Sequence, residues 1–147
     1  MIPYLDAGFL LAVLVKTDGA AIASQVLRRF TAPFLLNFMH QLQAENLLVA
    51  LQNSPELERQ TLGNEGFYTW RNYMAEGVFQ LVPADWDSAF RNAITWNSQL
   101  AEAPPAPLLL LHPALAAVAG ASHFLSFDPR SRAIAKRAGL SLIPETL

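Results

Sequence analysis

Short apolar runs alternate with segments of helical periodicity along the chain, and this alternation constrains the fold more than any other feature. A few apolar residues bounded by turn residues are typical of a buried strand, whereas apolar residues three and four apart are typical of a helix. Strands that alternate with helices predict an α/β fold with a mostly parallel sheet. The expected strands are residues 2–5, 34–36, 78–82, 123–127 and 140–143.

Helices are expected between these strands. Asp85 is placed to cap the helix over residues 88–100, and Pro55 to lie in the first turn of the helix that follows it. Pro113 is expected to begin a helix, because a proline inside a helix costs about 3 kcal/mol. The proline-rich residues 102–107 predict a loop. The other expected helices are residues 9–15, 20–30, 40–51, 113–120 and 130–138.

Composition indicates one folded domain that contacts a partner. Hydrophobic residues make up 52% of the chain and charged residues 15%, which excludes an intrinsically disordered protein. No repeat or boundary divides the 147 residues, so we expect a single domain over residues 1–147. The charged fraction lies below the roughly 25% of ordinary domains, which predicts apolar surface covered by a homodimer partner or another protein. The absence of cysteine excludes disulfides and thiolate zinc sites.

Charge and hydropathy bear on location and on nucleic-acid binding. No apolar stretch reaches the roughly 20 residues that cross a bilayer, and the apolar N-terminus lacks a basic leader, so a cytoplasmic protein without a membrane segment is expected. The net charge of −2 does not give the basic footprint of a typical nucleic-acid-binding protein. A local basic cluster near the C-terminus is expected to be a solvated helix face rather than an RNA contact; it comprises Arg130, Arg132, Lys136 and Arg137.

Two aspartates follow expected strands. Asp6 comes directly after the first strand, and Asp128 after the fourth. Ligands of parallel α/β sheets bind beyond the carboxyl ends of the strands, so the pair is a candidate site. An aspartate in this place is also a common helix N-cap, and for either residue alone the cap is the simpler interpretation.

Several stretches resemble the PIN-domain family, and in particular its VapC-like toxin ribonucleases. The opening Tyr-Leu-Asp-Ala-Gly-Phe-Leu-Leu-Ala of residues 4–12 resembles the strand, acid and helix that begin these domains. Residues 120–128 and 135–140 resemble the closing Ser-Phe-Asp segment and the short helix after it. Residues 40–48 and 109–117 resemble the helices that carry the second and third acids of the family. The resemblance spans the chain and implies a three-layer α/β/α sandwich with a mostly parallel central sheet.

The resemblance also implies a metal-dependent endoribonuclease. In such a site carboxylates hold Mg²⁺ or Mn²⁺, which stabilises charge on the scissile phosphate and activates a water. Asp6 and Asp128 correspond to metal ligands, and the hydroxyl of Ser126 to a group that orients a ligand. Gln43 falls where the second acid is expected, although a shift of register would place Glu45 there.

The acidic site is therefore half missing. Leu109 falls where the family has its third acid, and no acid lies between Glu102 and Asp128. Because hard cations need several oxygen ligands, we expect weakened or lost catalysis in a VapC-like toxin paired with a small antitoxin. The alternative is a non-catalytic PIN-fold module that binds RNA or a protein.

The histidines and tryptophans have plainer interpretations. His40, His112 and His123 lack partners at metal-ligand spacing; a structural hydrogen bond is expected for His40, and a place at a helix N-terminus for His112. Bases could stack on Trp70, Trp86 and Trp96, together with Tyr68 and Tyr73, but core packing or a dimer interface is the favoured interpretation.

Overall fold

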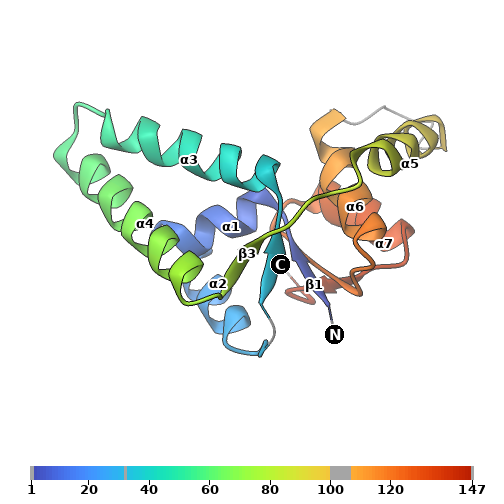
Figure 1. Ribbon diagram of the computed structural model, residues 1–147, viewed down its shortest axis with the longest axis horizontal. Helices are drawn as coiled ribbons and strands as arrows, with labels where there is room; N and C mark the ends of the chain where they lie inside the picture. The colour runs from blue at the N-terminus through green and yellow to red at the C-terminus, as the bar shows by residue number, and fades with distance from the viewer. Residues whose placement is uncertain (1, 32, 100–106, 147) are drawn as a thin grey trace. The chain divides into compact units, whose positions relative to one another are not determined.

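The computed structural model describes residues 2–31, 33–99 and 107–146. Within these residues the chain forms seven helices and five strands, and both sheets are parallel (Figure 1). The α/β class predicted from the alternation is confirmed. Contacts group the chain into two compact units, one of Met1–Asp6 with Pro83–Leu147 and the other of Ala7–Val82. The proline-rich loop predicted before Pro107 lies outside the described residues.

The first unit contains a three-stranded sheet. Its strands are β1 (Pro3–Leu5), β4 (His123–Leu125) and β5 (Ser141–Ile143), in the order β1-β4-β5. Tyr4 pairs with Phe124, and their rings stack with centroids 6.1 Å apart. Leu5 lies opposite Leu125, and both side chains are fully buried, so the centre of the sheet is apolar on both faces.

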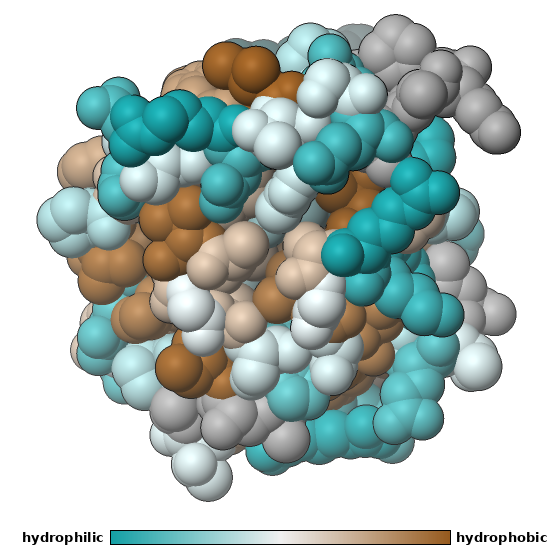
Figure 2. Space-filling model, turned by 90° about the vertical axis from the view of Figure 1, so that its right-hand side faces the viewer, coloured by the Kyte–Doolittle hydropathy of each residue, from teal (hydrophilic) through white to brown (hydrophobic). Residues whose placement is uncertain are grey.

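The helices of this unit are α5 (Trp86–Gln99), α6 (Pro107–Val118) and α7 (Pro129–Arg137). The predicted cap of α5 is confirmed, because the Ser88 N–H donates to Asp85 Oδ1 at 3.0 Å. Exposed apolar side chains remain on α5 and α6, namely Phe90, Ile94 and Leu108. Figure 2 shows the face on the side of α5, α6 and α7 in Figure 1, where hydrophobic residues lie among hydrophilic ones.

The predicted start of α6 is wrong. The helix begins at Pro107 and runs through Pro113, so Leu109 lies inside the helix rather than before it. Pro107 suits the first turn, where its missing N–H leaves no bond unmade. Pro113 is fully buried, and its helical neighbours from Leu110 to Ala116 are buried too. Burial of this continuous apolar stretch outweighs the roughly 3 kcal/mol that an internal proline costs.

The second unit contains a two-stranded sheet and the remaining helices. Strands β2 (Phe34–Leu36) and β3 (Phe79–Leu81) pair in parallel, with Phe34 opposite Phe79. The helices are α1 (Ala7–Leu14), α2 (Ala20–Leu27), α3 (Phe38–Gln52) and α4 (Leu57–Ala75).

The start of α4 also differs from the prediction. Glu56 is its N-cap residue and Leu57 its first residue, so Pro55 precedes the helix instead of lying in its first turn. Ser54 stabilises this entry, because its Oγ accepts a hydrogen bond from the Glu56 N–H at 3.3 Å. Its carbonyl accepts another from the Gln60 side chain at 2.8 Å.

Two buried glycines allow α3 and α4 to pack closely. A Cβ atom at Gly63 would lie 2.8 Å from the backbone nitrogen of Gln52 and 3.0 Å from the carbonyl oxygen of Leu48. A Cβ at Gly66 would lie 2.4 Å from Leu48 Cδ2. A larger side chain at Gly63 would therefore push the helices apart, and one at Gly66 would have to displace the Leu48 side chain, which explains glycine inside a helix despite its low propensity.

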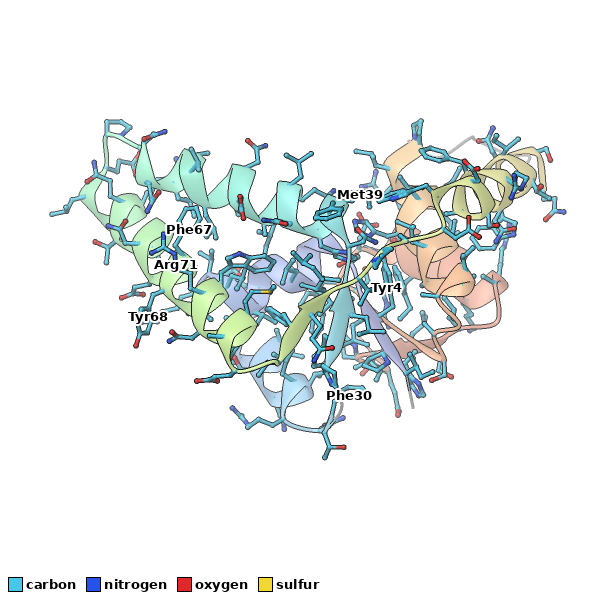
Figure 3. The ribbon with its side chains drawn as sticks, in the orientation of Figure 1. Tyr4, Phe30, Met39, Phe67, Tyr68 and Arg71 are labelled. Atoms are coloured by element: carbon cyan, nitrogen blue, oxygen red, sulfur yellow. The ribbon has the colours of Figure 1, made fainter. Side chains whose placement is uncertain are left out.

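An aromatic cluster fills the core beside β3. Phe79 is fully buried, and the rings of Phe34, Trp70 and Tyr73 lie with centroids 5.2–6.3 Å from its own. The predicted core position of Trp70 is confirmed, since the side chain is 5% exposed. Elsewhere on α4, the guanidinium carbon of Arg71 lies 5.8 Å from the centre of the Phe67 ring. Tyr68 is exposed and points away from the core (Figure 3).

Within the residues that the structure describes, no helix is both long enough and apolar enough to cross a bilayer.

Candidate functional site

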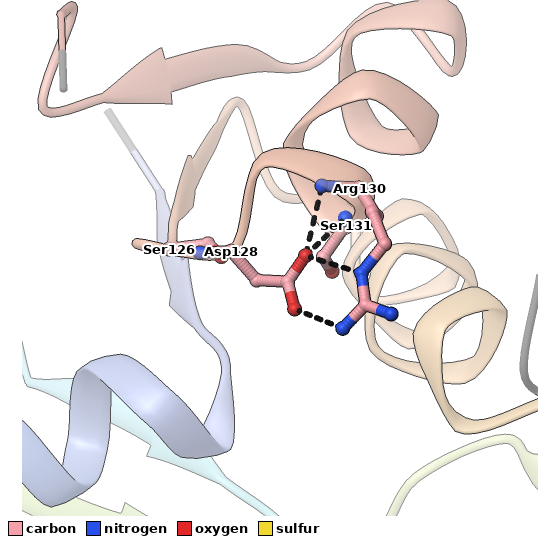
Figure 4. Close-up of polar contacts among 4 residues, drawn as sticks. All are labelled: Ser126, Asp128, Arg130 and Ser131. Atoms are coloured by element: carbon pink, nitrogen blue, oxygen red, sulfur yellow. Dashed lines mark hydrogen bonds and ion pairs between the residues drawn. The ribbon is translucent and has the colours of Figure 1, made fainter.

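Asp128 caps helix α7 (Figure 4). Its Oδ1 accepts hydrogen bonds from the backbone N–H groups of Arg130 at 2.8 Å and Ser131 at 3.2 Å. Pro129 follows as the first helical residue, where it requires no donor. The simpler interpretation of this aspartate, as a helix cap, is therefore confirmed.

Arg130 pairs with the same carboxylate. Its Nη2 lies 3.0 Å from Asp128 Oδ2, and its Nε donates to Oδ1 at 3.4 Å. The hydrogen bonds from the Arg130 side chain lower the pKa of Asp128; partial burial opposes them, and the backbone N–H donors of Ser131 and Arg130 lower the pKa further. Both carboxylate oxygens of Asp128 thus accept hydrogen bonds from groups of the protein itself.

Replacing Asp128 with asparagine should make stability less dependent on acid pH. A folded-state pKa below the unfolded value, which is about 3.9 for Asp, adds stability that is complete above that value and is lost as pH falls through the folded pKa. Because asparagine also caps helices well, the variant isolates the charge. We expect the free energy of unfolding of Asp128→Asn to be about 1 kcal/mol below that of the wild type near pH 7 and equal to it near pH 2. Urea unfolding at a series of pH values measures both. Equal losses at both pH values would contradict this assignment.

Asp6 lies at the same edge of the sheet. It follows β1 directly, and its backbone N–H donates to the carbonyl of Leu125, the last residue of β4, at 3.0 Å. The residue is 6% exposed. Since β1 and β4 are neighbouring parallel strands, Asp6 and the Ser126–Asp128 turn emerge from adjacent carboxyl ends, as predicted from the sequence.

A buried arginine is the feature that sequence reasoning missed. Arg132, on α7, is 6% exposed, although it was predicted to lie on a solvated helix face. Its Nη1 donates to the carbonyl of Ser126 at 2.9 Å, and its Nη2 to the carbonyls of Pro144 at 2.6 Å and Glu145 at 3.4 Å. Arg132 lies three residues before the buried Ala135, so both are on the inward face of α7, whereas Arg130 is not. This spacing is the sequence signal that could have distinguished Arg132 from Arg130.

Arg132 brings positive charge toward Asp6. Burial lowers the pKa of Arg132, and the negative charge of Asp6 opposes that effect by raising it. An arginine remains charged under all ordinary conditions. The carboxyl-end edge of this sheet therefore holds two acids and two guanidinium groups from the chain itself.

Ser126 also lies at this edge of the sheet. Its side chain is fully buried, and its Oγ accepts a hydrogen bond from the Asp128 N–H at 3.0 Å. Its carbonyl oxygen accepts from Arg132. Ser126 thus stabilises the turn that leads to Asp128. Its hydroxyl contacts the backbone of Asp128 and not the carboxylate.

The candidate residues on α3 belong to the second unit. Gln43 and Glu45 are both half-buried, and an α-helix turns about 200° between them, so they project from different sides of α3. Glu45 Oε1 accepts a hydrogen bond from Gln41 Nε2 at 2.8 Å, one turn earlier. Leu109, in the first unit, is half-buried in α6, a helix with no acidic residue.

The histidines have structural contacts. His40 completes a capping box at α3, in which its Nδ1 accepts from the Asn37 N–H at 3.1 Å and Asn37 Oδ1 accepts from the His40 N–H at 3.3 Å. The predicted structural bond of His40 is confirmed. The N-terminal position predicted for His112 is wrong: it is buried in the middle of α6, and a 3.1 Å hydrogen bond joins its Nδ1 to Tyr4 Oη.

The arrangement does not fit a divalent metal well. Within residues 2–31, 33–99 and 107–146, no group of three or more histidine, aspartate or glutamate side chains is placed to hold an ion. Asp128 is engaged by Arg130 and two backbone donors, and Arg132 adds positive charge toward Asp6. Cations at the edge of the sheet oppose a second cation in the same place.

Comparisons with known proteins add no relatives. The chain matches no protein-family model, and a search of curated proteins finds no significant match.

Proposed function

We propose that this chain is a PIN-like protein of the VapC type whose metal-dependent ribonuclease activity is weakened or lost. The order of the motifs along the sequence supports the family, as does a parallel sheet in which β1 and β4 are neighbours. The proposal includes the three-layer α/β/α sandwich that the resemblance implies. It also includes a homodimer and a small antitoxin as partners.

One observation carries the loss of activity: the carboxylate of Asp128 is already satisfied by protein donors. Its oxygens accept from two backbone N–H groups and from the Arg130 guanidinium. Mg²⁺ and Mn²⁺ take oxygen ligands and would have to displace these bonds. If a metal did bind, Asp6 and Asp128 would hold it and it would stabilise charge on a phosphate.

A Mn²⁺ titration with a cleavage assay tests the proposal. We expect calorimetry to give millimolar binding or none, since few carboxylates remain, and cleavage of a mixed RNA pool to be weak or absent, with any residual cleavage removed by Asp6→Asn. Asp18→Asn, at an exposed aspartate in the second unit, is the matched control for loss of one negative charge. Micromolar Mn²⁺ binding together with cleavage, both abolished by Asp6→Asn and kept by Asp18→Asn, would sink the proposal and restore an active nuclease.

A second candidate is a module that binds a partner without cutting RNA. It is favoured by an exposed apolar face on α3, where Phe38, Leu42 and Val49 are 68%, 70% and 45% exposed. These residues recur at helical spacing on one side of the helix. The same assay separates the candidates, because a residual nuclease retains some cleavage that depends on Asp6, and a binding module has none.

A further inference from the structure

A pocket lies between α5 and α7 of the first unit, apart from the strand-end acids. Its volume is about 300 Å³, at the small end of the range for ligand pockets. Trp96 and Gln99 line it from α5, and Arg137 and Ala138 line it from the end of α7. The remaining lining residue is Ile134, which is 5% exposed and therefore forms the apolar floor.

Trp96 reaches this pocket because of how α5 packs. The inward face of α5 carries Ala89 and Ala93, both buried, and Trp96 continues that face one turn further. The small alanines let the helix backbone approach its neighbours, whereas the indole at the end stays half-buried. An aromatic face that is part of a pocket wall can take a flat ligand by stacking.

Among the described residues that line the pocket, Arg137 is the one charged side chain. Arg137 lies in the last turn of α7 beside Lys136, and both side chains are exposed. Two other members of the basic cluster bind groups outside the pocket: Arg130 pairs with Asp128, and Arg132 donates to backbone carbonyls. Among the described residues, no ion pair uses Arg137, and no acidic residue lines the pocket.

We propose that this pocket binds one nucleotide, with the base stacked on Trp96 and the phosphate held by Arg137. The indole supplies the flat face, and the guanidinium supplies donors that match phosphate geometry. The side-chain amide of Gln99 can donate to and accept from the edge of a base. A single strand fits these features better than a duplex, whose bases are stacked within it. The site is independent of the acids at the strand ends, so it does not depend on the loss of ribonuclease activity.

Binding of a uridine decamer, an adenosine decamer and free AMP should be measured in EDTA, where metal-dependent cleavage cannot contribute. We expect Trp96→Leu to weaken binding of the decamers about 5- to 100-fold, since stacking on one aromatic side chain contributes that much. Arg137→Gln should weaken binding and reduce the slope of log K against log salt by about 0.7. AMP binding as tight as that of the decamers would identify a free nucleotide as the ligand, and tighter decamer binding would identify a single strand; either supports the pocket.

Matched variants separate the pocket from general charge and folding. Arg59→Gln removes an exposed arginine from α4 and should leave affinity within about twofold of the wild type. Trp86→Leu removes the other tryptophan of α5 and should keep the quenching of tryptophan fluorescence that nucleotide binding causes. No binding by the wild type, or equal binding by wild type and Arg137→Gln, overturns the proposal. Arg137 is exposed, so its variant still tests the pocket even if Trp96→Leu fails to fold.

Discussion

Replacing Arg132 with methionine is expected to lower the free energy of unfolding by about 3 kcal/mol. Methionine keeps the length and apolar stem of the side chain but removes every donor. The carbonyl oxygens of Ser126 and Pro144, which accept from the guanidinium at 2.9 and 2.6 Å, would lose their partners. The charge that acts on the buried Asp6 would be lost as well. Urea unfolding followed by circular dichroism measures the effect.

Arg130→Met is the matched control for this experiment. It is the same chemical change two residues away, on a side chain that is 71% exposed. Exposed ion pairs contribute about 0–1 kcal/mol, so the control should lose much less. Arg132→Lys should fall in between, because a lysine cannot direct donors to separate carbonyls as a guanidinium does. If Arg132→Met proves as stable as Arg130→Met, the buried hydrogen bonds of Arg132 do not stabilise the fold.

Gly63→Ala is expected to destabilise the second unit by about 2 kcal/mol, even though alanine is the better helix former by about 1 kcal/mol. The added methyl group would meet backbone atoms of α3, the nitrogen of Gln52 at 2.8 Å and the oxygen of Leu48 at 3.0 Å. Backbone atoms within a helix cannot move singly, so the whole of α3 must shift. Thermal unfolding of the variant beside the wild type measures the cost.

Two comparisons sharpen this test. Gly66→Ala should cost less, because its nearest contact is the end of the Leu48 side chain, which can change rotamer. Thr61→Ala, at an exposed position of the same helix, should stay within about 0.5 kcal/mol of the wild type. A higher melting temperature for Gly63→Ala would mean that α3 and α4 are not in close contact at this point.

The alternation of strands and helices was readable from the sequence because it depends on local patterns. Counting along apolar runs predicts that Asp6 directly follows a strand, which is confirmed, whereas β4 ends at Leu125 and Asp128 comes three residues after it. The start of α6 was wrong because a local rule, that proline begins a helix, ignored the burial around Pro113. Propensity gives way where a continuous apolar surface packs against its neighbours.

The chemistry of the candidate site was less predictable. The sequence allows Asp128 to be either a metal ligand or a helix cap. The structure shows the cap, because the backbone N–H groups of Arg130 and Ser131 donate to its carboxylate. Arg132 is as charged as Arg130, and its burial depends on carbonyls contributed by residues 126 and 144, which local patterns do not relate to it. Trp96 and Arg137 lie on different helices, so their shared pocket is a product of tertiary packing.

The pairing of β1 with β4 also has a consequence for synthesis of the chain. Tyr4 is synthesised before its partner Phe124, and 119 residues lie between the two. Residues 7–82 form a unit of their own and can fold in that interval, whereas β1 must wait with its apolar side chains uncovered. Strand β1 is therefore synthesised before the unit of residues 7–82 but joins its sheet after that unit has been made. During that delay, the apolar side chains of β1 are open to capture by a chaperone.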